Sequence, residues 1–132
     1  MEERVGLSSS ANRLVTILAL LLLAPAASSL ADDNKDRAKK QVEFGIEVAQ
    51  LGLWKEAVYR WSKAVELDPE NASARNNLAV AYEQTGDFDQ ANVEYERALE
   101  LEPNNMYIRQ NYELFREAYE RKKRTDRRSG SN

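Results

Sequence analysis

Apolar residues recur at helical spacing along most of the chain after residue 37, and the pattern of one stretch returns further along the chain. Residues 52–69 (GLWKEAVYRWSKAVELDP) align without gaps to residues 86–103 (GDFDQANVEYERALELEP), with six identities in eighteen positions. In each copy an alanine, a large aromatic residue and a second alanine lie on one face of a helix. They are Ala57, Trp61 and Ala64 in the first copy and Ala91, Tyr95 and Ala98 in the second. A fixed period of this length predicts stacked helical hairpins.

Glycine and proline mark the ends of the predicted helices. Gly52 and Gly86 each come at the end of a helix, where a left-handed residue is commonly needed, and Pro69 and Pro103 stop the helix that follows. The first helix is therefore expected to end at about Leu51. The helices that follow are expected over residues 54–67, 72–85, 88–101 and 106–123.

The first and last helices each have one apolar face at helical spacing. This face consists of Phe44, Gly45, Val48 and Leu51 in the first helix and of Ile108, Tyr112, Phe115 and Tyr119 in the last. Glu113 and Arg116 stand where a third unit would need small and aromatic packing residues, so the last helix is expected to close the array. Asp87 is the expected N-cap of the helix over residues 88–101, with Gln90 completing a capping box.

These positions resemble the tetratricopeptide repeat (TPR) motif, in which a small residue of one helix packs on an alanine, aromatic, alanine face and a proline closes the unit. The matching residues are Gly45, Gly52, Ala57, Trp61, Ala64 and Pro69 in one copy and Ala79, Tyr82, Gly86, Ala91, Tyr95, Ala98 and Pro103 in the next. The resemblance implies an all-α fold, a short right-handed α-solenoid of antiparallel helix hairpins with five helices. Its repeats would be residues 38–71 and 72–105, followed by the closing helix over residues 106–123.

The family usually binds an extended or helical peptide in a concave groove, so the resemblance implies a protein or peptide partner. Carried over residue by residue, the groove would consist of Lys39, Val42, Ile46, Ala49, Asn76, Val80, Glu83, Gln84, Tyr107, Gln110 and Leu114. Asn76 and Asn77 resemble the amides with which the family grips a peptide backbone, and an ordinary surface position is the alternative. Val42 and Ile46 stand where some chaperone cofactors clamp a terminal carboxylate with lysine and asparagine, so such a clamp is not expected.

Residues 1–31 have the charged, apolar and small-residue regions of a secretory signal peptide. Two arginines precede an apolar run over residues 14–24, Pro25 is expected to break the helix, and cleavage is expected after Ala31. The apolar run is shorter than the roughly 20 residues that span a bilayer. We therefore expect a periplasmic or secreted protein, with an uncleaved membrane anchor as the alternative.

Charge is unevenly distributed along the chain. Residues 41–105 contain 13 acidic and 5 basic residues, whereas residues 116–132 contain 7 basic and 3 acidic residues. Residues 32–37 are expected to form a charged extension, and residues 124–132 a basic, disordered tail that contacts anionic lipid in an alternative interpretation. Nucleic acid is not an expected partner. A homo-oligomer is left open, because two repeats fall below the minimum of about three for a stable array.

The composition offers no set of catalytic or metal-binding residues. The 132 residues contain no cysteine and no histidine, which removes thiolate chemistry, the usual zinc ligands and the commonest general base. Glu94 and Glu96 lie two positions apart on a helix and therefore point in different directions. Asp87 and Asp89 resemble the start of a calcium loop, but the glycine and the closing glutamate of that loop are missing. We therefore expect a non-catalytic protein without a cofactor or a metal ion.

Overall fold

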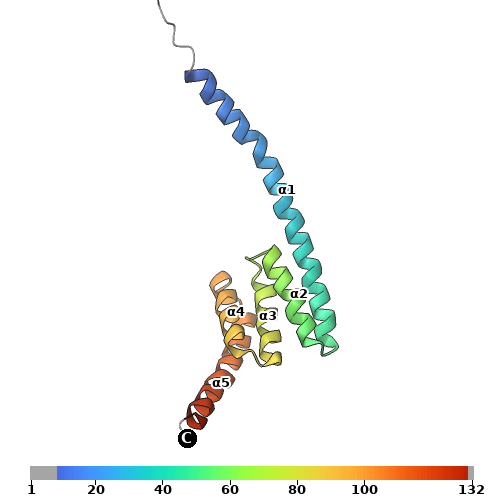
Figure 1. Ribbon diagram of the computed structural model, residues 1–132, viewed down its shortest axis with the longest axis vertical. Helices are drawn as coiled ribbons and strands as arrows, with labels where there is room; N and C mark the ends of the chain where they lie inside the picture. The colour runs from blue at the N-terminus through green and yellow to red at the C-terminus, as the bar shows by residue number, and fades with distance from the viewer. Residues whose placement is uncertain (1–8, 131–132) are drawn as a thin grey trace, which may run out of the picture. The chain divides into compact units, whose positions relative to one another are not determined.

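The computed structural model describes the backbone of residues 9–130 and the side chains of residues 28–130. Within that part the secondary structure is entirely helical, with no strand (Figure 1). The helices are α1 (Ser9–Gln50), α2 (Trp54–Leu67), α3 (Ala72–Thr85), α4 (Phe88–Leu101) and α5 (Met106–Ser129). The chain forms two compact units, residues 1–34 and residues 35–132, and the second unit contains the packed hairpins. The predicted all-α array of five helices is therefore confirmed.

The bounds of α2, α3 and α4 coincide with the predicted ranges, whereas both outer helices are longer than expected. Helix α1 continues through Pro25, so the helix break expected there is wrong. Proline removes one backbone donor, and the strong helix formers around it sustain the rest of the helix. The predicted signal peptide lies partly outside the described residues, which exclude residues 1–8. In the described part of the chain, no helix is both long and apolar enough to cross a membrane.

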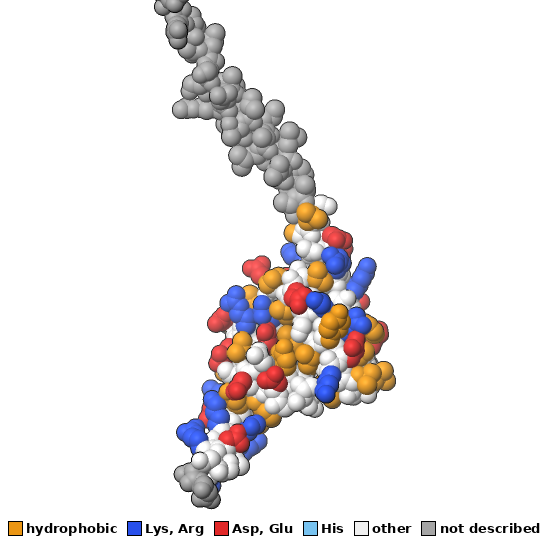
Figure 2. All heavy atoms as spheres, in the orientation of Figure 1, with side chains coloured by type: hydrophobic (Ala, Val, Ile, Leu, Met, Phe, Trp, Pro, Cys, Tyr) orange, Lys and Arg blue, Asp and Glu red, His pale blue; other side chains and the backbone are white. Residues whose placement is uncertain are grey.

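Helix α5 ends at Ser129, well beyond the predicted end at residue 123. The tail expected to be disordered from residue 124 is thus helical up to residue 129, because arginine and lysine are good helix formers. A Lys122–Asp126 ion pair at 2.7 Å, four positions apart, supports this helix. Figure 2 shows the Lys and Arg side chains gathered along this end of α5.

Each alanine, aromatic, alanine face is buried, as predicted. In the first hairpin Ala57 and Trp61 pack with Val48 of α1 and with Leu78 and Ala81 of α3. In the second hairpin Ala91 and Tyr95 pack with Ala79 of α3 and Phe115 of α5, while Ala98 packs with Ala72 and Ile108. The core therefore consists of small alanines that let neighbouring helices approach and of large aromatic residues that fill the remaining space.

Gly45 lies directly against the Trp61 ring. The Trp61 indole Nε1 donates a hydrogen bond to the Val42 carbonyl oxygen at 3.1 Å, which places the ring over the α1 backbone. A Cβ atom at Gly45 would overlap the indole. The corresponding pair in the second repeat is Ala79 and Tyr95, in which a smaller ring faces a methyl group. In each repeat the size of the small residue therefore fits the size of the ring that faces it.

The predicted glycine turns are confirmed. Gly52 and Gly86 have φ angles of 75° and 85°, in the left-handed region that favours glycine. The predicted capping by Asp87 is wrong, because its side chain makes no cap hydrogen bond. Asp87 has a ψ angle of 68° instead of the more extended backbone of an effective N-cap residue.

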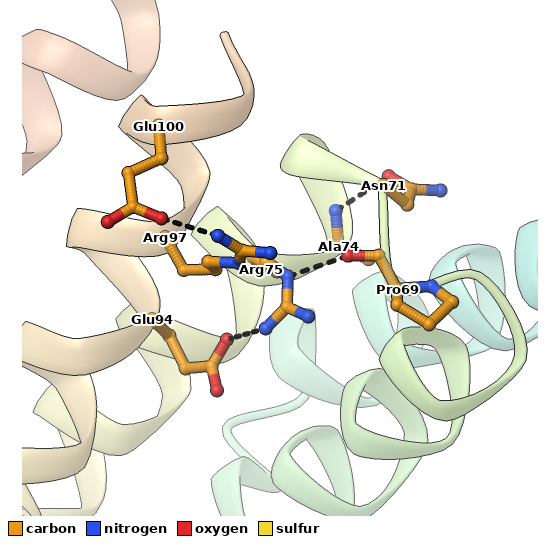
Figure 3. A network of polar contacts seen from close by, with 7 residues as sticks. All are labelled: Pro69, Asn71, Ala74, Arg75, Glu94, Arg97 and Glu100. Carbon is orange, nitrogen blue, oxygen red and sulfur yellow. Dashed lines mark hydrogen bonds and ion pairs between the residues drawn. The ribbon is translucent and has the colours of Figure 1, made fainter. Parts of the chain in front are cut away.

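The junctions between units share a set of hydrogen bonds that we call the clasp. Figure 3 shows the junction that precedes α3. Asn71 Oδ1 accepts from the Ala74 N–H at 2.9 Å, and Arg75 Nε donates to the Pro69 carbonyl at 2.9 Å. An ion pair at 2.8 Å then joins Arg75 to Glu94 of α4. The same cap and the same arginine-to-proline bond recur at the next junction, made by Asn105, Arg109 and Pro103. The clasp thus fixes the turn that begins α3 and the turn that begins α5.

The predicted packing face of α1 needs a correction. Gly45 and Val48 are buried, but Phe44 and Leu51 are exposed to solvent, 41% and 74% respectively. Phe44 occupies the repeat position of Leu78, which packs with α2 in the core, and no helix takes the place of α2 beside Phe44 within residues 35–130. Leu51 lies at the end of its helix, and Thr85 at the same repeat position is also exposed.

Candidate functional site

A surface depression of about 410 Å³ collects side chains from four helices, and we call it the inner depression. It is lined by Ile46, Ala49 and Gln50 of α1, Trp54 and Trp61 of α2, Asn77 and Val80 of α3, and Tyr107 of α5. The lining combines aliphatic and aromatic surface with two side-chain amides. It contains no carboxylate, no lysine and no hydroxyl other than the Tyr107 phenol. Such a surface suits an apolar side chain whose neighbouring backbone needs hydrogen bonds.

The structure brings together four of the eleven predicted groove residues, namely Ile46, Ala49, Val80 and Tyr107. Four others are exposed but do not line the inner depression: Lys39, Gln84, Gln110 and Leu114. The remaining three make contacts inside the fold: Val42, Asn76 and Glu83. Val42 is half-buried against the first hairpin core, and its carbonyl oxygen accepts the Trp61 indole hydrogen bond.

The sequence predicts that Asn76 lies in an exposed groove, and this is wrong. The residue is buried, with 1% of its surface exposed. Its Oδ1 accepts from Asn111 Nδ2 at 3.1 Å, and its Nδ2 donates to Asn77 Oδ1 at 3.5 Å. The amide therefore connects α3 to α5 within the array. Asn77, the neighbouring residue, lines the inner depression instead. The sequence contains the pair but does not indicate which amide is buried, because that depends on where α5 packs.

Replacing Asn76 by alanine is expected to reduce the free energy of unfolding by about 1–3 kcal/mol, because the half-buried Asn111 amide loses its acceptor. Urea unfolding followed by far-UV circular dichroism measures this change. Gln110→Ala is the matched control, since Gln110 is exposed on α5 and its loss should change stability by a few tenths of a kcal/mol. Equal unfolding midpoints for the wild-type chain and Asn76→Ala would contradict a structural role for Asn76.

Glu83 is held by the second hairpin core instead of being free for a ligand. The Tyr95 hydroxyl donates to Glu83 Oε2 at 3.3 Å. Burial raises the pKa of the Glu83 carboxyl, and the Tyr95 hydrogen bond opposes this shift. Burial also raises the pKa of the Tyr95 phenol, with the Glu83 carboxylate adding to the effect, so the hydroxyl stays protonated and remains the donor.

Sequence reasoning does not identify Gln50, Trp54 and Trp61 as lining residues, whereas Asn77 belongs to the asparagine pair that resembles peptide-gripping amides. Trp61 is buried in the first hairpin core, as its place on the alanine, aromatic, alanine face predicts. The edge of a packed ring can still form the floor of a surface depression. The described residues contain no group of three or more His, Cys, Asp or Glu side chains that could hold a metal ion.

Sequence comparison supports the interpretation of the repeats. A profile described as "TPR repeat" matches residues 47–86, and one described as "Tetratricopeptide repeat" matches residues 72–105. The chain therefore contains tetratricopeptide repeats, a class of module that generally mediates interactions between proteins without catalysis. A comparison with curated protein sequences finds no match.

Solved structures share the fold. The TPR domain of Arabidopsis OM64 is similar with a TM-score of 0.63 and 24% identity, over 68% of this chain and 74% of that one. A point mutant of MamA is similar with a TM-score of 0.58 and 27% identity, over 70% of this chain and 69% of that one. A yeast Sti1 TPR2AB structure in complex with an HSP90 peptide has a TM-score of 0.62 and 20% identity, over 85% of this chain. This chain spans 42% of the Sti1 structure.

Proposed function

We propose that this protein is an exported adaptor, periplasmic or in the cell envelope, that binds a peptide or helix of a partner protein without catalysing a reaction. The observation that carries the proposal is the inner depression, where Ile46, Val80 and Tyr107 converge from three different helices beside the Asn77 amide. The tetratricopeptide repeats support a binding role, and the structurally similar Sti1 domain is solved as a complex with a peptide.

The lining of the inner depression favours an internal peptide segment over a chain terminus. No lysine or arginine lines it, so a terminal carboxylate would find no cation there. Two amides, Gln50 and Asn77, can instead donate to and accept from a peptide backbone. The ligand would therefore place a bulky apolar side chain against Ile46 and Val80, with its backbone near Asn77.

Val80→Glu is expected to lower the recovery of the partner by about tenfold or more, because an unpaired charge would enter an apolar contact. The measurement is a crosslinking pull-down from the native cell with the tagged full-length chain, quantified by mass spectrometry. Val93→Glu is the matched control, since Val93 is 54% exposed on α4 and does not line the inner depression. Equal recovery of one partner by Val80→Glu and Val93→Glu would contradict binding at this site.

The same sample tests the proposed export through the mass of the mature N-terminus. A chain that begins at Asp32 supports cleavage of residues 1–31 and release from the membrane. An intact N-terminus in the membrane fraction supports the alternative, a membrane-anchored scaffold with the apolar run over residues 14–24 retained.

A further inference from the structure

Three positions of the repeat unit face the preceding hairpin, and they are buried or half-buried in α3 and α5, which such a hairpin precedes. In α3 they are Ala74, Leu78 and Ala81, all buried. At the same repeat positions of α5 they are Ile108, Tyr112 and Phe115, of which Ile108 and Phe115 are fully buried and Tyr112 is half-buried. The corresponding positions of α1 are Lys40, Phe44 and Glu47, which we call the α1 face.

The α1 face is exposed and combines one aromatic ring with two opposite charges. Phe44 lies at its centre, contacted by the Arg60 guanidinium at 4.2 Å from the ring centroid. Lys40 lies one turn before Phe44 and Glu47 lies nearly one turn after it, and both are exposed. Among the ion pairs of residues 28–130, none involves Lys40 or Glu47.

Because the basic, aromatic and acidic side chains follow one another along the helix, the charges of the α1 face are complementary to those of a second, antiparallel copy. If two copies of α1 pack antiparallel about a two-fold axis near Phe44, Lys40 of each protomer lies opposite the partner's Glu47, and the two Phe44 rings meet at the centre. A parallel arrangement would place like charges opposite each other, which is unfavourable. We propose that the chain forms a symmetric homodimer through antiparallel packing of the α1 face.

The opposite end of the array does not offer an equivalent surface. Met106, Gln110 and Glu113 of α5 occupy the positions of Ala72, Asn76 and Ala79, which are buried beneath α4 and α5 in the second repeat. A charged residue in place of a small one prevents a further hairpin from packing closely there. Pairing at the α1 face would join two short arrays into one of four repeats, above the minimum of about three. The pairing does not depend on the inner depression, which contains none of Lys40, Phe44 and Glu47.

Sedimentation velocity of the purified full-length chain tests the dimer. We expect a species of twice the monomer mass whose dissociation constant rises by about tenfold or more in Phe44→Glu, because a buried ring is replaced by a charge on each side of the axis. Val93→Glu is the matched control and should leave the dimer unchanged, since Val93 lies on α4, away from the α1 face. Circular dichroism of each variant confirms that the helices are retained.

Charge exchange tests the antiparallel geometry directly. Lys40→Glu and Glu47→Lys are each expected to weaken self-association by about tenfold, because each puts like charges opposite one another twice. An equimolar mixture of the two variants should form a one-to-one dimer, since one protomer then supplies only acidic and the other only basic side chains at these positions. The double variant should also regain the wild-type dissociation constant. The control is an exchange of the charges of Arg97 and Glu100, an exposed ion pair on α4.

Three results would overturn the proposal. The first is a monomer at every concentration measured, which would mean that the α1 face remains solvated or takes a different protein. The second is a dimer that Phe44→Glu leaves intact. The third is a failure of the two charge variants to pair with each other although each still folds.

Discussion

Phe115→Ala is expected to lower the free energy of unfolding by about 3–5 kcal/mol, the range typical of removing a buried phenylalanine. The ring is 1% exposed and lies at the centre of an aromatic cluster. Its centroid is 5.1 Å from that of Tyr95, 5.3 Å from that of Tyr119 and 6.1 Å from that of Phe88. Loss of the ring would leave a cavity between α4 and α5 and remove these contacts. The total free energy of unfolding of a small domain is about 5–15 kcal/mol, so this substitution would remove a large share of the stability.

Urea unfolding followed by circular dichroism gives the stability change for Phe115→Ala, and amide hydrogen exchange shows where it acts. We expect the amides of α5 to lose protection first, because α5 depends on this cluster for its attachment to α4. Leu114→Ala is the matched control at the next position, where the side chain is 63% exposed, and should cost less than about 0.5 kcal/mol. Similar losses for the two variants would show that the cluster does not hold α5.

Gly45→Ala is expected to destabilise the chain by about 1–3 kcal/mol, although alanine normally favours a helix. The added methyl group would overlap the Trp61 indole, whose Nε1 is fixed by its hydrogen bond to the Val42 carbonyl. The ring would have to move away from α1 and give up that bond. The steric cost therefore exceeds the gain in helix propensity, which is below about 1 kcal/mol.

The second repeat shows how the overlap at Gly45 can be relieved. There alanine faces tyrosine, as Ala79 and Tyr95. Gly45→Ala should therefore cost less in a Trp61→Tyr background than in the wild-type chain, and a double-mutant cycle from urea unfolding measures the difference. A coupling free energy of about 1 kcal/mol or more is expected between the two positions. Additive effects would indicate that the indole and Gly45 are not in steric contact.

Much of the array could be predicted because the repeat encodes its structure locally. The bounds of α2, α3 and α4 follow from glycine turns, proline stops and alanine spacing, all of which act within one unit. The clasp was missed although its residues also recur at the period of the repeat, as Asn71 with Asn105 and Arg75 with Arg109. Alignment of the turn residues would have shown both pairs, so the signal was present in the sequence.

The errors at Pro25 and Asp87 concern local helix signals, and the others concern features that depend on neighbours or on the ends of the array. Asn76 was placed in the groove, but its burial depends on Asn111 of α5, which comes much later in the chain. Helical spacing places Phe44 and Leu51 on the apolar face of α1, but Phe44 lacks the preceding hairpin that buries Leu78 at the same repeat position, and Leu51 lies at the exposed end of its helix. Predicted export and the partner groove remain predictions, because they concern processing and binding. The same holds for the exposed groove residues outside the inner depression, Lys39, Gln84, Gln110 and Leu114.

The hydrogen bonds of the clasp are made by residues of the turn itself and of the first turn of the next helix, so they do not depend on which repeats precede and follow. Asn71 caps α3 and Arg75 holds the Pro69 carbonyl using residues close to the turn, and Asn105 and Arg109 do the same at the next junction. A second copy of residues 72–105 inserted after Asn105 would therefore meet a complete clasp at both of its ends. The array can therefore gain whole repeats, either by gene duplication or by protein engineering. The closing helix would keep its contacts with the last hairpin in each case.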